Sequence, residues 1–207
     1  MALPLGARQL RNHIHYERGY QMKKIAFCAT VIAIVLLMPM SAKAQGNMSI
    51  GAGIDLMLPV GSFGDSWGTG FGGTAEFDYV LNAKFSVTGK IGYLTWSSKN
   101  LPTGWSATYS GVPVLAGIKW YPSFIPKGAV RIYGHLEMGI MFGSLSTSGP
   151  SGRTYPFAAA GSDFTIVPSV GVEIPAGPNG NIDISGRYFD ISRKGSIGFR
   201  AGYKLAI

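Results

Sequence analysis

Cysteine is almost missing from this chain of 207 residues, since its one cysteine, Cys28, lies in an apolar stretch near the N-terminus. Without that stretch the chain has no cysteine, which excludes a disulfide framework and a thiolate metal site. A lipoprotein signal is excluded too. It needs a cysteine just after the apolar stretch, whereas Cys28 follows Phe27 near its beginning.

Charge is scarce as well. Charged residues make up 14% of the chain and hydrophobic residues 46%, yet no long apolar run follows residue 44. A helical protein with several membrane spans needs several runs of about 20 apolar residues, so this class is excluded. The 30 glycines and the 12% of aromatic residues therefore favour β structure in lipid.

Little positive charge remains once the N-terminal part is set aside. The net charge of the whole chain is +8, but one acidic residue, Glu17, and six basic residues precede residue 45. The six are Arg8, Arg11, Arg18, Lys23, Lys24 and Lys43. Twelve basic and nine acidic residues remain after them, without a cluster of Lys and Arg. A nucleic-acid partner is therefore not expected.

The N-terminal part has the three segments of a secretory signal peptide. Met22 begins a basic stretch, residues 25–38 are nearly all apolar, and residues 41–44, Ser-Ala-Lys-Ala, supply small residues for cleavage. A membrane-anchoring helix is the alternative, because the apolar stretch approaches spanning length. Pro39 and the Ala-Lys-Ala site favour cleavage.

Three regions follow from this pattern. Residues 1–21 are interpreted as an over-extended N-terminus, with a genuine long leader as the alternative. Residues 22–44 are predicted to be the signal peptide, cleaved after Ala44. Residues 45–207 are predicted to form the mature domain.

Eight segments of the mature part alternate apolar and polar side chains, which is the period of a β-strand. Their apolar faces cover residues 50–58, 71–81, 85–93, 112–120, 130–142, 164–174, 182–188 and 197–207. Segments of about ten residues with this alternation are the units of membrane-spanning barrels. The sequence thus predicts an all-β fold, an eight-stranded antiparallel up-and-down transmembrane β-barrel.

The opposite faces of these segments carry a nearly balanced set of charges, six acidic and seven basic, with His135 among them. The charged residues are Asp55, Glu76, Asp78, Glu137, Glu173 and Asp183 with Lys84, Lys90, Lys119, Arg131, Arg187, Arg200 and Lys204. Because unpaired buried charge is very costly, this balance is typical of a crowded interior. We predict that these residues form a luminal ion-pair network that plugs the barrel.

Glycine separates a membrane barrel from a soluble one, which would have its apolar face inside. Eleven strand glycines lie on the polar faces and four on the apolar faces. Glycine weakens a water-exposed strand, whereas the bore of an eight-stranded barrel barely holds side chains. Small residues there make room for Lys, Arg and Glu. The polar face is therefore interpreted as the lumen.

The connections alternate in length, as expected where short periplasmic turns alternate with longer external loops. The short set is 82–83, 122–128 and 175–180, and the long set is about 59–70, 97–107 and 144–161. The seventh connection, 192–195, is short and breaks the pattern.

Two prolines interrupt the predicted strands. Proline cannot donate to a strand ladder, and a closed barrel has no free edge to hold it. We expect a bulge near Pro168, or a strand that begins there, and a bulge at Pro113.

Together these features resemble the small outer-membrane β-barrel family that includes the OmpA transmembrane domain and OmpX. The likeness covers about residues 46–207 and includes the last segment, where Tyr203, Leu205 and Ile207 alternate to the end. The resemblance implies that this ending is the signal read by the barrel-assembly machinery, although many relatives end in Phe. It also implies a monomer in the bacterial outer membrane, in contact with membrane lipids and lipopolysaccharide.

Catalytic chemistry finds little support. The resemblance extends to outer-membrane lipid A deacylases, which use a His and a Ser two residues apart on a lipid-facing strand. Here Glu137 stands two residues after His135 and faces the lumen. We predict no enzyme and no cofactor, and a lone histidine cannot form a metal site.

The loops carry an aromatic set that suits contact with lipopolysaccharide, a host surface or a partner protein. It comprises Trp67, Trp105, Arg153, Tyr155 and Phe157. Alternatively, these residues cap the barrel mouth or lie in the interfacial aromatic belt.

Two functions remain open, a structural or surface-binding barrel with a plugged lumen and a small porin-like channel for polar solutes. A lipid A-modifying enzyme is a distant third. Strand number separates the first two, because eight strands leave no continuous water path.

Overall fold

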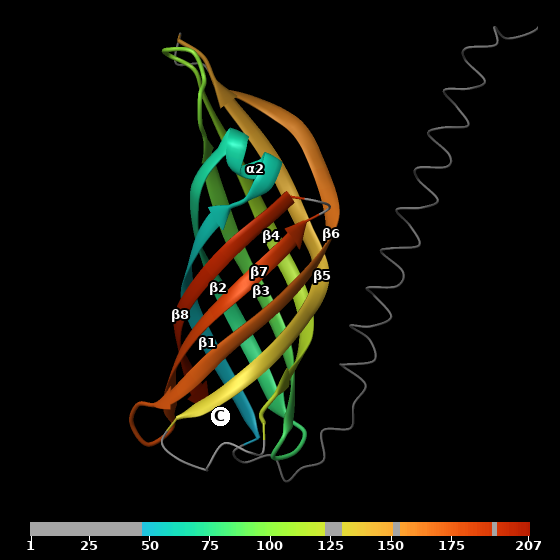
Figure 1. The fold of residues 1–207 in the computed structure, drawn as a ribbon, viewed down its shortest axis with the longest axis vertical. Coiled ribbons are helices and arrows are strands. Elements are labelled where there is room, and N and C mark those ends of the chain that lie inside the picture. The colour runs from blue at the N-terminus through green and yellow to red at the C-terminus, as the bar shows by residue number, and fades with distance from the viewer. Residues whose placement is uncertain (1–46, 123–129, 151–153, 192–193) are drawn as a thin grey trace, which may run out of the picture. The chain divides into compact units, whose positions relative to one another are not determined.

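The computed structural model describes the backbone of residues 47–122, 130–150, 154–191 and 194–207, and the side chains of 47–122, 130–150, 161–191 and 195–207. Within these residues eight strands and one short helix form a single closed barrel (Figure 1). The elements are β1 (Met48–Pro59), α2 (Gly61–Ser66), β2 (Trp67–Val80), β3 (Phe85–Ser98), β4 (Ser106–Trp120), β5 (Arg131–Ser148), β6 (Thr154–Pro175), β7 (Gly180–Ile191) and β8 (Lys194–Ala206). Among the described residues no helix is long and apolar enough to cross a membrane.

Each strand pairs antiparallel with the next one in sequence, and β8 pairs with β1 to close the barrel. This last ladder runs from Ser49 opposite Ala206 to Pro59 opposite Ser196. The expected all-β, eight-stranded antiparallel barrel is confirmed.

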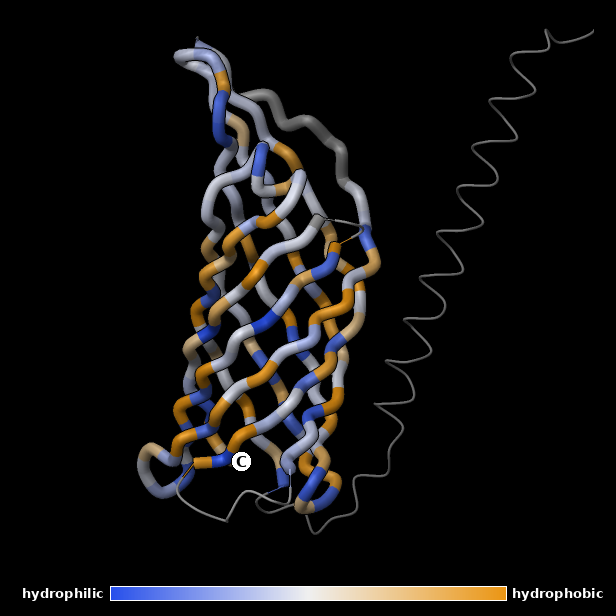
Figure 2. Tube along the Cα trace, viewed as in Figure 1, coloured by the Kyte–Doolittle hydropathy of each residue, from blue (hydrophilic) through white to orange (hydrophobic). Residues whose placement is uncertain are grey.

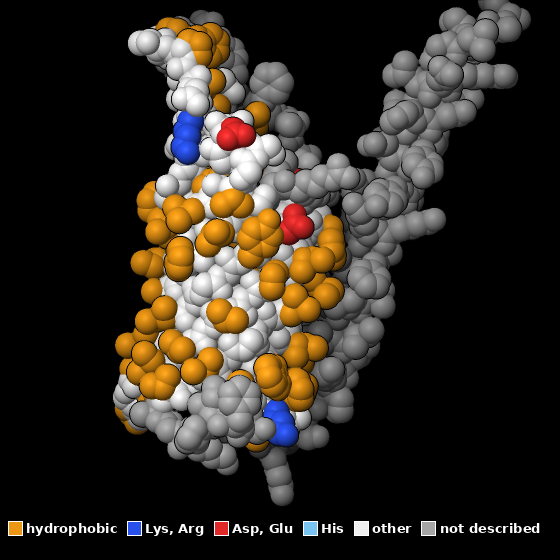
Figure 3. All heavy atoms as spheres, in the orientation of Figure 1, with side chains coloured by type: hydrophobic (Ala, Val, Ile, Leu, Met, Phe, Trp, Pro, Cys, Tyr) orange, Lys and Arg blue, Asp and Glu red, His pale blue; other side chains and the backbone are white. Residues whose placement is uncertain are grey.

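The strands place apolar side chains outside and charged side chains inside. Ile54 is 73% exposed and Val170 68%, whereas Glu137 and Lys119, on inward-facing positions, are 0% exposed. Apolar and polar residues alternate along the traced strands (Figure 2). Hydrophobic side chains cover the visible wall, and the described charges there lie toward its ends (Figure 3). A soluble barrel has the reverse arrangement.

Glycines on the inner face allow large side chains to cross the lumen. A Cβ added to Gly198 would lie 2.7 Å from Met57 Sδ and 2.8 Å from Arg187 Cγ. A Cβ added to Gly186, on the outer face, would have no heavy atom within 4 Å. The inner glycines are therefore a packing requirement of the narrow bore.

The two prolines leave the register unchanged, so the expected bulges at these sites are wrong. Pro168 lies on the outer face within continuous β6, opposite Leu136 of β5, and the β6–β7 register is the same before and after it. In the ladder between β6 and β7 only the pairs at residues 167–168 are absent, so this ladder tolerates the missing N–H of Pro168. Pro113 faces inward opposite Met141, again without a shift. Register shifts occur instead near Gly143 in the β5–β6 ladder and between residues 67 and 70 in the β2–β3 ladder.

The barrel has two different ends. We call the end with the connections 81–84, 121–130 and 176–179 the turn end, and the end with 60–66, 99–105, 149–153 and 192–193 the loop end. The expected long loop over 144–161 is wrong, because β5 and β6 continue through most of it as an extended hairpin. The first long connection contains α2.

Candidate functional site

Four carboxylates surround one ammonium in the turn-end half of the lumen. Lys204 projects inward from β8, and its Nζ lies within hydrogen-bonding distance of all four carboxylates. The four are Asp78 at 2.8 Å, Glu76 at 2.9 Å, Asp183 at 3.0 Å and Glu173 at 3.1 Å. They come from β2, β6 and β7, so the cluster joins strands that are distant around the wall.

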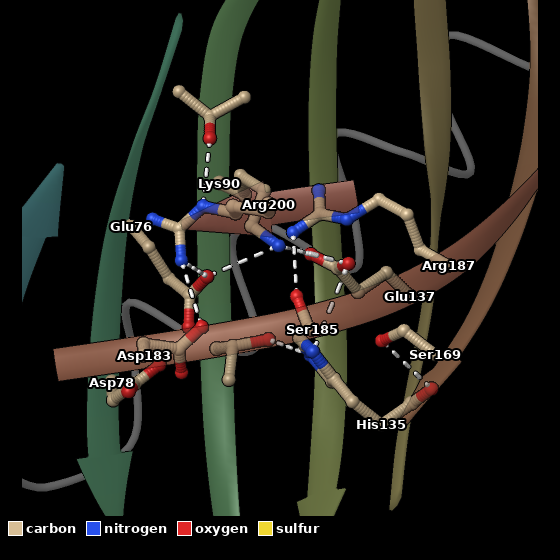
Figure 4. A network of polar contacts seen from close by, with 12 residues as sticks. Glu76, Asp78, Lys90, His135, Glu137, Ser169, Asp183, Ser185, Arg187 and Arg200 are labelled. Atoms are coloured by element: carbon tan, nitrogen blue, oxygen red, sulfur yellow. Dashed lines mark hydrogen bonds and ion pairs between the residues drawn. The ribbon is translucent and has the colours of Figure 1, made fainter. Parts of the chain in front are cut away.

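Three more cations balance this cluster, and two of them, Lys90 and Arg200, are labelled in Figure 4. Lys119 of β4 contacts Glu76, and its Nζ lies 3.2 Å from Asp78 Oδ2. Arg200 donates from its Nη1 to Asp183 Oδ1 at 3.1 Å. Lys90 lies 3.0 Å from Glu76 Oε2 and bridges to a further carboxylate of β5, Glu137 Oε1, at 2.8 Å.

A second group continues the network toward the loop end. Arg187 Nη1 lies 3.2 Å from Asp55 Oδ1, while Thr74 Oγ1 donates to Asp55 Oδ2 at 2.8 Å. Arg200 Nε donates in turn to Thr74 Oγ1 at 3.0 Å. Charge-assisted contacts of this kind offset part of the cost of burying the ions.

The structure brings twelve of the fourteen predicted luminal residues together, each no more than 6% exposed. They are Asp55, Glu76, Asp78, Lys90, Lys119, His135, Glu137, Glu173, Asp183, Arg187, Arg200 and Lys204. Lys84 is outside this group, since it lies exposed in the β2–β3 turn with its backbone N–H donating to Asn82 Oδ1. Arg131 is at the edge, with its side chain 49% exposed and its Nη1 3.9 Å from Glu173 Oε2. Both positions are at strand ends, where alternation no longer fixes which way a side chain points.

Two tyrosines, Tyr121 and Tyr133, cover the turn-end side of the cluster. The alternation of apolar and polar residues did not predict this position for Tyr121. The hydroxyl of Tyr121 donates to Glu173, and that of Tyr133 to Asp183. Arg131 stacks over the ring of Tyr121 at 4.0 Å. Burial raises the pKa of the Tyr121 hydroxyl, and the Glu173 carboxylate raises it further, so the phenol stays a donor.

Thr88, His135 and Glu137 are arranged in the order of the nucleophile, base and acid of a catalytic triad. Unlike the members of a catalytic triad, they are not accessible from solvent. The Nε2 of His135 is 2.8 Å from Thr88 Oγ1, and its Nδ1 is 3.7 Å from Glu137 Oε2. Glu137 is 0% exposed and already paired with Lys90, and Thr88 is 1% exposed. A substrate therefore has no path to the hydroxyl. Among the described residues no group of His, Cys, Asp and Glu could hold a metal ion.

The loop-end half of the lumen is apolar, which the sequence reasoning missed. Its core is a cluster of fully or nearly fully buried side chains that project inward from six strands and α2. The cluster is Met57, Phe63, Leu94, Trp96, Leu115, Met141, Val167, Phe189 and Ile191. The sequence did indicate this cluster, because its strand residues are apolar at positions that alternate in phase with the charged residues.

The helix α2 closes this apolar half with one side chain. Phe63 is 5% exposed, and its ring centroid lies 5.8 Å from Trp96, 6.0 Å from Tyr109 and 6.1 Å from Trp67. Such tilted and edge-on contacts are favourable for aromatic rings. Trp67, predicted as a loop contact, is thus partly buried in the mouth of the barrel.

The other predicted loop contacts are placed differently. Trp105 is 47% exposed and lies over Gly149, where an added Cβ would be 3.4 Å from its ring. Arg153 and the side chains of Tyr155 and Phe157 lie outside the described residues.

The predicted assembly signal lies on the outer face at the end of β8. Tyr203, Leu205 and Ile207 are each between 44% and 57% exposed. The Tyr203 hydroxyl donates to the carbonyl of Ala176 at 3.0 Å, and the N–H of Ile207 donates to the carbonyl of Met48 at 2.9 Å.

No family model matches this chain, and no curated protein matches it either. Solved structures do. Ail, the attachment invasion locus protein of Yersinia pestis, in complex with the heparin analogue sucrose octasulfate, matches with a TM-score of 0.53 and 18% identity, over 76% of this chain and 96% of that one.

Two further structures match over similar lengths. Neisserial surface protein A has a TM-score of 0.52 at 16% identity, over 78% of this chain and 97% of that one. The outer membrane protein OprG from Pseudomonas aeruginosa has a TM-score of 0.52 at 12% identity, over 78% and 96%. The fold is therefore that of small outer-membrane β-barrels.

Proposed function

We propose that this chain is a bacterial outer-membrane β-barrel that acts through its structure or its surface, not as a pore. An exposed apolar wall around a charged interior supports residence in a membrane. The likeness in fold to small outer-membrane barrels supports the outer membrane. The signal peptide over 22–44, with cleavage after Ala44, supplies the export route.

The observation that carries the proposal is a lumen closed in two successive layers. Toward the turn end, Lys204 and its four carboxylates are each no more than 5% exposed. Toward the loop end, Trp96, Met141 and Phe189 are 0% exposed. An ion would have to break the first layer and then cross the second, where nothing replaces its hydration shell.

Conductance in planar bilayers tests this proposal. The protein is purified from outer membranes and shown to be folded by its altered gel migration before boiling, and a porin serves as the positive control. We expect no steady current from inserted protein. A steady, ion-selective current would overturn the closed lumen and support the porin-like channel.

The ligand of the Ail complex, a heparin analogue, is not part of this proposal. Of the side chains described at the loop end, Lys99 is the cationic one, and its Nζ is directed to the carbonyl of Gly64 at 3.3 Å.

An enzymatic role is tested separately. We expect the mass of lipid A to be unchanged when the protein is expressed, because His135 and Thr88 are buried in the lumen. A new or missing acyl chain would contradict this expectation.

A further inference from the structure

Three neighbouring strands reverse the polarity of their outer face where they approach the loop end. Tyr93 of β3, Val112 of β4 and Phe142 of β5 lie on the outer face, and Val112 is paired with Phe142. Beyond them toward the loop end, the outward positions no longer carry apolar side chains. The reversal coincides with the loop-end parts of β4 and β5, which extend past the rest of the wall (Figure 1).

Hydroxyl groups take over these outward positions in register. Thr95 pairs with Ser110, and Ser110 with Ser144. Ser97 pairs with Thr108, and Thr108 with Ser146. Ser106 pairs with Ser148. We call these eight residues the hydroxyl face, and each is exposed or partly exposed.

Between the first two of these rows, the inner face of the same strands carries apolar side chains that are covered. Trp96, Tyr109 and Leu145 are aligned there by the same ladders, and Phe63 of α2 packs against Trp96 and Tyr109. At this level the wall formed by β3, β4 and β5 is therefore packed inside and hydroxyl-lined outside.

The hydroxyl face contains no charged residue. An exposed protein surface usually has about a quarter to a third of Lys, Arg, Glu and Asp, so eight successive neutral hydroxyls suggest a neighbour other than bulk water. Hydroxyls both donate and accept hydrogen bonds, and on a sheet they stand about 4.8 Å apart across strands and about 7 Å apart along them. Such a grid suits a partner that is itself lined with hydroxyls.

We propose that the hydroxyl face docks the core sugars of lipopolysaccharide from the surrounding outer membrane. This rests on the proposed outer-membrane location. The face continues the lipid-facing wall without a gap, so whatever lies directly above the acyl chains on this side of the barrel lies against it. Sugar rings with many hydroxyls can bind there by hydrogen bonds without requiring cations from the protein.

The test compares one hydroxyl row with a matched row on the other side of the same strands. The test variant combines Ser97→Ala, Thr108→Ala and Ser146→Ala. The control combines Ser98→Ala and Thr147→Ala, which lie at nearly the same height but in phase with the inner face. Because Ser98 Oγ accepts a hydrogen bond from the Ala107 N–H at 3.0 Å, each variant is compared with its own midpoint in phospholipid alone. The unfolding midpoint in urea is followed by gel migration in vesicles of phospholipid, phospholipid with lipid A, and phospholipid with core-containing lipopolysaccharide.

We expect core-containing lipopolysaccharide to raise the midpoint of the wild type above its value with lipid A. The test variant should lose at least half of this increase, while the control keeps it. An increase that survives in the test variant, or one equally large with lipid A alone, would overturn the inference. Failure of the wild type to insert into any vesicle would overturn the proposed function and, with it, this inference.

Discussion

Replacing Lys204 with methionine removes the cation at the centre of the turn-end cluster. Methionine keeps most of the length of the side chain, so the change is mainly one of charge. Four carboxylates within 3.1 Å of the lost Nζ then keep Lys119 and Arg200 as their main buried partners. Breaking a buried ion pair by removing one partner costs about 3–5 kcal/mol.

Urea unfolding in phospholipid vesicles, followed by gel migration, measures this loss. With a slope of about 2 kcal/mol per M, the expected destabilisation lowers the midpoint by about 1.5–2.5 M. The control is Lys84→Met, which removes an exposed lysine and should change stability by no more than about 0.5 kcal/mol. Adding Glu76→Gln to Lys204→Met should restore part of the loss, because one excess negative charge disappears.

The deficit of Lys204→Met should also shrink in mildly acidic buffer, since protonation of a carboxylate relieves the excess negative charge. A midpoint for Lys204→Met equal to that of Lys84→Met would refute the reasoning, as would a double variant less stable than Lys204→Met.

Three further predictions concern other parts of the chain. Phe63→Ala should lower stability by about 3–5 kcal/mol, measured by the same unfolding assay, and a cost below 1 kcal/mol would show that α2 does not close the lumen. Gly139→Ala should destabilise by about 1–3 kcal/mol, because its Cβ would press on the Val114 carbonyl, whereas Gly186→Ala on the open outer face should be nearly neutral. Ala44→Arg should leave an uncleaved precursor on gels, while N-terminal sequencing of the wild type should begin at Gln45; a wild type that begins elsewhere would contradict the predicted site.

The strand pattern was predictable because a lipid-facing wall and a crowded lumen impose opposite requirements on alternate residues. Asp183 and Arg200 could be assigned to the interior from their phase alone. The position of a residue in the alternation does not specify its ion-pair partner, since contacts such as that of Lys204 with Glu173 cross the lumen between strands that are not adjacent.

Two features could not be predicted by treating the polar face as uniform. Leu94 and Trp96 alternate in phase with the inward-facing residues. Because the whole lumen was predicted to be polar, these two apolar residues were not assigned to it. The segment beyond Ser144 was predicted to be a loop, although the outward serines at the end of β5 are compatible with a strand wherever the outer face leaves the hydrocarbon. In both cases the environment of a face changes with height along the barrel, which periodicity does not report.

The placement of Arg200 and Lys204 has a consequence for how the barrel reaches its final state. Both lie on β8, the strand that closes the wall, while the carboxylates they bind come from β2, β6 and β7. A sheet that lacked β8 would retain every acidic member of the network but lose two of its five buried cations. With β8 in place the buried charges are six acidic and five basic, whereas without it they are six and three. The interior therefore comes close to neutrality only when the last seam closes, so an incomplete barrel is penalised by more uncompensated charge than the complete one.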